Sequence, residues 1–139
     1  MVDIDVSYDG ELHCSAVHGP SSARLSTDAP VDNQGRGEAF SPTDLVATAL
    51  GTCMATVMGI QARKRGSDLP GMRIHVKKHM TREPPRRIAR LDVDVSVPSE
   101  VASVFDTEAR AALEHAANTC PVRLSILDAI EVPVKFDWR

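Results

Sequence analysis

One uncharged stretch limits the possible folds of this chain more than any other feature. Residues 45–62 carry no charged side chain, and apolar or small side chains surround a helix built from them on all sides of its first four turns. Such a helix has no polar face and must be enclosed. In a chain of 139 residues, enclosure on every side is easier if a second copy covers part of the helix, so we predict an intertwined homodimer.

Strong local signals mark both ends of this helix. Ser41 offers a hydroxyl N-cap, Pro42 fits the first helical position, and Asp44 stands where an acid completes an approximate capping box. At 64–66 the sequence Lys-Arg-Gly places two cations and a glycine at the C-terminal end. We therefore predict a helix that starts after Ser41 and ends near residue 66.

The remaining elements are predicted from periodicity. Six short segments carry strand-like patterns, and Asp9-Gly10 between the first two is a strong hairpin signal. These segments lie at 4–8, 11–17, 23–27, 72–77, 91–97 and 130–136. Helical spacing predicts a second helix at 101–117, and residues 28–40 indicate an exposed loop of functional length. The predicted fold is α+β, in the order βββ-α-ββ-α-β, with one domain over 1–139.

Composition and charge exclude several classes of function. A net charge of -3 and a pI near 5.9 provide no basic stripe for phosphates, so we expect no nucleic-acid partner. Threonine, glycine and glutamine interrupt 45–62, so this stretch is expected to fall short of a membrane span. The first residues carry acids where a signal peptide carries cations, which places the chain in the cytoplasm. In that compartment three cysteines are more often free, catalytic or metal-bound than structural disulfides.

The three cysteines lie in different local settings. Cys53 lies in mid-helix, where no helix N-terminus stabilises a thiolate, so an inert core cysteine and a functional one are about equally plausible. Cys120 precedes Pro121, which fits the start of a short helical turn, and an N-cap position is expected to lower its pKa. Cys14 alternates with apolar residues and is interpreted as core. The histidines match no zinc pattern, so no metal site is expected.

Two motifs together resemble the OsmC/Ohr family of hydroperoxide-reducing proteins. Residues 40–45 read Phe-Ser-Pro-Thr-Asp-Leu and 49–53 read Ala-Leu-Gly-Thr-Cys, which is similar to that family's SPxEL and ALGxC pattern. Residues 119–122 read Thr-Cys-Pro-Val, similar to its second motif, a cysteine before Pro-Val. The resemblance implies a domain-swapped α/β dimer, whose sheets wrap two central helices and whose active sites lie at the subunit interface.

The resemblance also implies a chemistry. Cys53 would be the peroxidatic thiol, which attacks a small-molecule hydroperoxide and becomes a sulfenic acid. Cys120 would be the resolving thiol, forming a Cys53–Cys120 disulfide that an external dithiol reduces. Neither a metal nor a bound organic cofactor is implied. Two alternatives remain open: a ligand-binding or structural dimer without peroxide turnover, and a protein that exchanges disulfides with other proteins.

The family's peroxidases hold their thiolate with an arginine that a glutamate orients. For the arginine, Arg24 is our first candidate and Arg36 our second, while Arg123 could instead serve Cys120. The glutamate's position holds Thr43, and Glu38 in the preceding loop is the candidate substitute. Asp44 points away from residue 53 by helical rotation, so we assign it to the cap.

Overall fold

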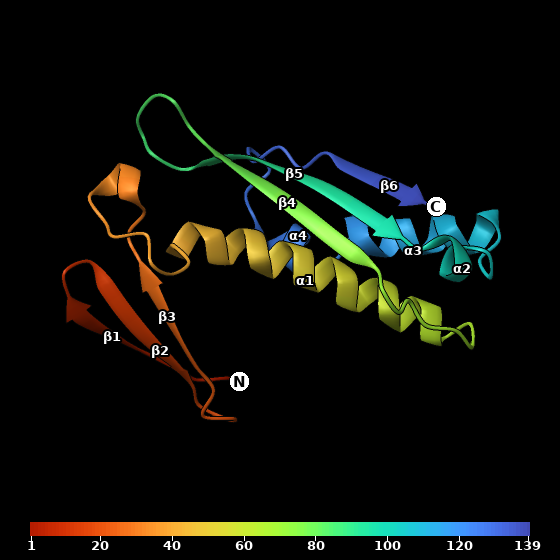
Figure 1. Cartoon of the computed structure of the whole chain (residues 1–139), viewed down its shortest axis with the longest axis horizontal. Helices are drawn as coiled ribbons and strands as arrows, with labels where there is room; N and C mark the ends of the chain where they lie inside the picture. Colours follow the sequence, from red (N-terminus) through yellow and green to blue (C-terminus); the bar gives the residue numbers. More distant parts are fainter. The chain divides into compact units, whose positions relative to one another are not determined.

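A computed structural model describes all residues 1–139, and the chain forms two compact units. The first unit is Met1–Val46 and the second is Ala47–Arg139 (Figure 1). The long helix α1 (Pro42–Arg63) begins in the first unit and continues in the second.

The first unit contains the predicted three-stranded antiparallel meander. Its strands pair in the order β1-β2-β3, and they span Ile4–Gly10, His13–His18 and Arg24–Asp28. The hairpin turn differs from the predicted Asp9-Gly10, because β1 continues to Gly10 and the turn residues are Glu11 and Leu12, both with positive φ. Positive φ at both central residues is the geometry of a type I′ hairpin turn, which follows the strand twist. A short 3-10 helix, η1 (Val31–Asn33), lies in the predicted loop.

The predicted signals at both ends of α1 are confirmed. The backbone N–H of Ser41 donates to Asp44 at 2.8 Å, and the N–H of Asp44 donates back to the Ser41 hydroxyl at 3.1 Å. This is the reciprocal capping box. At the other end Gly66 has φ +75, and the N–H of Ser67 donates to the carbonyl of Ala62. That bond belongs to the glycine-dependent C-cap known as the Schellman motif.

A single copy of the chain buries only one side of α1, so the predicted enclosure on every side stays a prediction that depends on a second copy. The buried positions recur at helical spacing and are Ala47, Leu50, Gly51, Met54, Met58 and Ala62. A second stripe of small or apolar residues stays exposed and comprises Thr48, Thr52, Thr56 and Ile60. Contrary to our expectation, α1 is long and apolar enough to cross a membrane by length and composition alone. The core helix of a protein in water passes the same test.

The second unit is built on a mixed sheet in the order β4-β5-β6. Its strands span Arg73–Met80, Ile88–Val97 and Val134–Trp138, with β4 antiparallel and β6 parallel to β5. The inner face of β5 is fully apolar, with Leu91, Val93, Val95 and Val97 all buried. The sheet packs closely on α1: a Cβ added to Gly51 would lie 3.2 Å from the Val76 side chain. The last strand starts at Val134, four residues later than the predicted 130.

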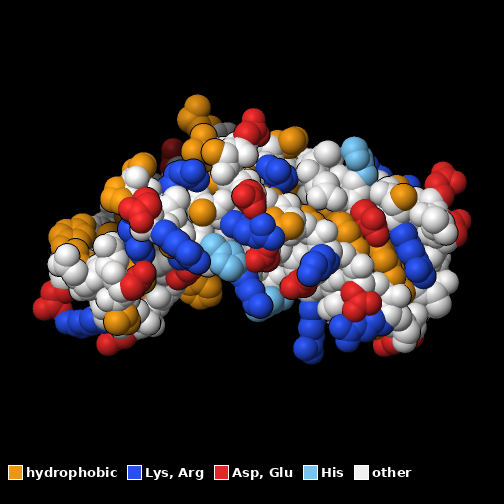
Figure 2. Space-filling model, turned by 90° about the horizontal axis from the view of Figure 1, so that it is seen from above, with side chains coloured by type: hydrophobic (Ala, Val, Ile, Leu, Met, Phe, Trp, Pro, Cys, Tyr) orange, Lys and Arg blue, Asp and Glu red, His pale blue; other side chains and the backbone are white.

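The outer face of this sheet carries the polar residues that alternate with apolar ones along β4 and β5. Strand register places His75 opposite Asp94 and Lys77 opposite Asp92, and Nε2 of His79 lies 2.7 Å from Asp92. Figure 2 shows lysine, arginine and acidic side chains interspersed over the face that it presents. Opposite charges facing each other across strands stabilise the pairing. The histidines of β4 are therefore exposed members of a charged surface.

The predicted second helix at 101–117 is two helices. They are α2 (Ser99–Ala102) and α3 (Thr107–Asn118), and a fourth, α4 (Pro121–Ser125), follows. The break is caused by Asp106, whose side chain accepts the N–H of Ala109 and caps α3. The guanidinium of Arg110 donates to the carbonyls of Ala102 and Phe105, which satisfies backbone acceptors at the corner.

Candidate functional site

Cys53 is held on the part of α1 that packs against the second sheet. It is partly exposed, and it lies between the exposed Thr52 and the fully buried Met54. Gly51, two residues earlier, allows the helix to approach β4 closely, as described above. The backbone at Cys53 is thus fixed by neighbours in the core, while its side chain sits at the boundary between buried and exposed surface.

Cys120 is the N-cap of α4, as predicted. Pro121 occupies the first helical position, Cys120 has an extended backbone, and its Sγ accepts the N–H of Arg123 at 3.4 Å. The side chain is buried, with 1% exposure. The turn forms here because proline favours a first helical position and the cysteine backbone is free to adopt the extended cap conformation.

Burial outweighs the cap in setting the acidity of Cys120. Removal from water raises the pKa of this thiol, the backbone N–H of Arg123 lowers it in part, and the side chain of Cys53 raises it again. The net direction is upward, so the predicted lowering is wrong. A buried sulfur loses more solvation of its thiolate than the backbone donors at the cap return.

The structure brings Cys53 and Cys120 together. The Cys53 side chain lies near enough to Cys120 to raise the pKa of its thiol, and both cysteines are free thiols. This proximity links the middle of α1 to the segment between α3 and α4, although the two cysteines are 67 positions apart in the chain. Two neighbouring thiols within one folded unit are candidates for oxidation to a disulfide. This pair is the candidate functional site.

The proposed thiolate-stabilising residues have other partners or are exposed. Arg24 lies on β3 opposite Val17 and is exposed. Arg36 forms an ion pair with Glu11. Glu38 is exposed, and its backbone N–H donates to Asp28 at 3.0 Å. Arg24, Arg36 and Glu38 all belong to the first unit.

Two further predictions concern residues beside the motifs. Arg123 contacts the Sγ of Cys120 through its backbone N–H. Asp44 caps α1, as assigned from helical rotation.

Cys14 lies between Tyr8 and Thr27 across the first sheet and is half-buried, so it is a core residue only in part.

Sequence reasoning missed one polar pair in the first unit. The Nδ1 of His13 lies 2.5 Å from Oδ1 of the buried Asp28. The strand patterns could have revealed the pair. Antiparallel pairing of 11–17 with 23–27 places the first residues of one segment opposite the last residues of the other. The pair borders a cavity of about 230 Å³ that is lined by Asp9, Gly10, Glu11, His13, Asp28, Arg36 and Glu38.

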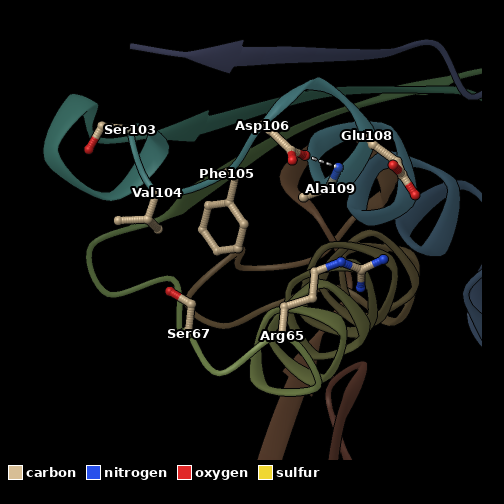
Figure 3. A pocket seen from close by; sticks show the side chains of 8 residues that line it. All are labelled: Arg65, Ser67, Ser103, Val104, Phe105, Asp106, Glu108 and Ala109. Carbon is tan, nitrogen blue, oxygen red and sulfur yellow. Dashed lines mark hydrogen bonds between the residues drawn. The ribbon is translucent and has the colours of Figure 1, made fainter.

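A larger cavity in the second unit has neither Cys53 nor Cys120 in its lining. It measures about 510 Å³ and is bordered by the end of α1 and the corner between α2 and α3. Figure 3 shows the Phe105 ring pointing into the space towards Ser67 and Arg65. Asp106 is engaged in capping α3, and Arg65 donates to Gln61. Because its lining contains neither Cys53 nor Cys120, this cavity is distinct from the thiol pair.

Comparison with known proteins assigns the chain to a family. Residues 35–135 match the model of the family described as OsmC-like protein. A solved structure from Psychrobacter arcticus, named for osmotic stress induction and a detoxification response, is 41% identical with a TM-score of 0.89, and the match covers 98% of this chain and 96% of that chain. No curated protein matches the chain.

More distant structures share the fold. An organic hydroperoxide resistance protein OsmC from Legionella pneumophila is 14% identical with a TM-score of 0.75, over 99% of this chain and 96% of that one. An organic hydroperoxide resistance protein from Elizabethkingia anophelis is 14% identical with a TM-score of 0.76, over 99% and 95%. The two motifs, the α+β fold and the match over 35–135 agree, and the chain therefore belongs to the OsmC-like family.

Proposed function

We propose that the protein is a cytoplasmic thiol-dependent peroxidase that reduces organic hydroperoxides or hydrogen peroxide. The observation that carries the proposal is the proximity of Cys53 to Cys120, because a peroxidatic and a resolving thiol must be able to join. Family membership supports it, since proteins of the same fold are named for organic hydroperoxide resistance. Arg24 and Glu38 are kept as proposed thiolate-stabilising residues.

The proposed catalytic cycle has three steps. The Cys53 thiolate attacks the terminal peroxide oxygen, the O–O bond breaks, and the leaving alkoxide takes a proton to become an alcohol, or water when the substrate is hydrogen peroxide. Cys120 then attacks the Cys53 sulfenic acid, which forms the S–S bond and releases water. An external dithiol reduces this disulfide and is itself oxidised. No step requires a metal or an organic cofactor.

One equivalent of tert-butyl hydroperoxide is expected to convert the reduced protein to a form lacking two hydrogens, with Cys53 linked to Cys120. Peptide mapping by mass spectrometry without reductant detects this linkage.

The rate of linkage, measured by rapid acid quench, should keep rising as pH is raised through the ordinary range of thiol titration. The reason is that the pKa of Cys120 is raised, so its attacking thiolate remains scarce at neutral pH.

Two variants control this experiment. Cys120→Ser is expected to stop at a Cys53 sulfenic acid, which a dimedone label reports as a single adduct. Cys14→Ser should give the same disulfide as the unchanged protein, because Cys14 lies on a strand of the other unit. Recovery of both thiols unmodified after peroxide treatment would contradict the proposed cycle.

We also propose that the protein is a homodimer. One face of the first sheet is apolar and exposed, with Ile4, Val6, Tyr8 and Leu25 all more than two-fifths accessible. The uncovered stripe of α1 adds a second surface of small and apolar residues. Exposed apolar side chains gathered on one face are typical of an interface. A second copy is the partner that the resemblance implies for both surfaces.

Val6→Lys is expected to shift the protein from dimer towards monomer in sedimentation velocity, because it places a charge in the middle of the apolar face. Ser7→Lys is the matched control, since neighbouring strand residues point to opposite faces. The control should sediment like the unchanged protein. A Val6→Lys protein that remains fully dimeric at micromolar concentration would remove this face from the interface.

A further inference from the structure

The His13–Asp28 pair is built into the first sheet by strand register. His13 and Asp28 lie directly opposite each other on β2 and β3. Asp28 is only 5% exposed, whereas the His13 side chain is 40% exposed. An ionised carboxylate can only accept hydrogen bonds, so the Nδ1–H of His13 is the donor in the 2.5 Å contact with Oδ1.

The other carboxylate oxygen of Asp28 holds the loop that follows β3. Its Oδ2 accepts the N–H of Glu38 at 3.0 Å, and the backbone of Ala39 also helps to lower the pKa of this carboxyl. The backbone N–H of Asp28 donates to the carbonyl of Phe40 at 3.1 Å. Asp28, just before loop 29–40, therefore anchors both Glu38 and Phe40 at the end of that loop.

The loop itself is closed tightly. The N–H of Gly37 donates to the carbonyl of Ala29, and the N–H of Gly35 donates to that of Pro30. A Cβ on Gly35 would lie 1.6 Å from the carbonyl oxygen of Ala29, so only glycine fits there. The Ala29 N–H in turn donates to Leu12 in the β1–β2 turn. Loop 29–40 is thus a compact unit, and the Asp28 carboxylate is its principal side-chain anchor.

The charges around the imidazole are mostly negative. Asp28 faces it from β3, Asp9 from β1, Glu11 from the β1–β2 turn, and Glu38 and Arg36 from the loop, all around one cavity. Arg36 is paired with Glu11. The hydrogen bond from His13 is the largest cause that lowers the pKa of Asp28, with the Glu38 N–H adding to it and burial opposing it. The carboxylate is therefore ionised at neutral pH.

We propose that His13 and Asp28 form a pH-sensitive latch that holds loop 29–40 on the first sheet. An imidazolium adds the attraction of opposite charges to its hydrogen bond with the Asp28 carboxylate, whereas a neutral imidazole keeps only the hydrogen bond. Histidine is the side chain that ordinarily changes charge between about pH 5 and 8. Loss of the imidazolium charge weakens its hold on Asp28, and the loop amide bound to the same carboxylate opens more often.

The direction of the pH effect follows from both partners. The latch is tightest where the imidazole is charged and Asp28 is ionised. It loosens as pH rises and the imidazole loses its charge. It also loosens in strong acid, because the contribution of a carboxylate with a lowered pKa is lost as pH falls through its folded-state value. The latch stands independently of the peroxidase proposal, although it governs the placement of Arg36 and Glu38.

Hydrogen exchange of the Glu38 amide tests the latch in the chain of 139 residues. Its protection factor, corrected for the intrinsic pH dependence of exchange, is expected to fall by roughly fivefold between about pH 6 and pH 8, the factor expected when a partly exposed ion pair loses one of its charges. Amides in the middle of α1, such as that of Met54, should show no such fall. Equal protection of the Glu38 amide at both pH values would overturn the proposal.

Three variants separate the latch from a general effect of pH. His13→Asn keeps a side-chain N–H donor but cannot titrate, so its loop protection should be the same at both pH values. Asp28→Asn removes the anchoring charge, and its loop should exchange quickly throughout. His18→Asn is the matched control on the same strand, where the imidazole contacts Ser21 instead, and it should keep the pH dependence. A His13→Asn protein that retains that dependence would also overturn the proposal.

Discussion

Cys53→Ser is expected to reduce peroxide consumption by on the order of 10³-fold or more, to the rate of the dithiol reductant alone. A serine hydroxyl at this position remains protonated and cannot form a sulfenic acid. The measurement follows loss of tert-butyl hydroperoxide with dithiothreitol as reductant. Circular dichroism should show unchanged helix content, because one oxygen replaces one sulfur at a partly exposed position.

Comparison with the other cysteines makes the result specific. Cys14→Ser should keep full turnover, while Cys120→Ser should keep the first oxidation but lose the internal disulfide. If the unchanged protein turns over peroxide no faster than Cys53→Ser, the peroxidase proposal fails. That result would favour the alternative function, a ligand-binding or structural dimer. Disulfide exchange with protein substrates, in the absence of peroxide turnover, would instead indicate a thiol–disulfide redox protein.

Met54→Ala is expected to lower the free energy of unfolding by about 2–5 kcal/mol, measured by urea denaturation. Met54 is fully buried on the face of α1 that the second unit encloses. Truncation removes apolar contacts and leaves a cavity beside the residue that carries the proposed nucleophile. Turnover per folded molecule should fall as well, since the cavity loosens the part of α1 that presents Cys53.

Thr52→Ala is the matched control on the other side of Cys53. Thr52 is exposed, and its hydroxyl donates to the carbonyl of Thr48 within the same helix. Its truncation should change the free energy of unfolding by less than about 0.5 kcal/mol. Equal losses in the two variants would show that the buried stripe of α1 is not what anchors Cys53.

Local signals predicted most elements of the fold. The capping box at Ser41 and Asp44 and the C-terminal glycine at Gly66 act within one helical turn, so both ends of α1 were readable from the sequence. The break between α2 and α3 was missed because apolar residues keep helical spacing across Asp106. A cap competes with helix continuation locally, and the carbonyls released at the corner are satisfied by Arg110, which is a tertiary contact.

The same contrast between local signals and tertiary packing applies to the candidate site. Periodicity placed Cys53 in the long helix, and Pro121 identified Cys120 as a cap. Neither pattern could show that the thiols meet, because their contact depends on how α1 packs against the end of α3. The acidity of Cys120 was predicted in the wrong direction for a related reason: the cap is local, whereas burial is a property of the packed chain.

The thiol pair and the His13–Asp28 pair show what the sequence determined and what only tertiary structure decided. Residue types, strand and helix periods and the family motifs are properties of short segments, and they specified the elements and nominated Cys53 and Cys120. Which side chains touch depends on strand register and helix packing, which sum many weak contacts between distant segments. The proximity of the two thiols and the His13–Asp28 pair therefore emerged only from the folded units.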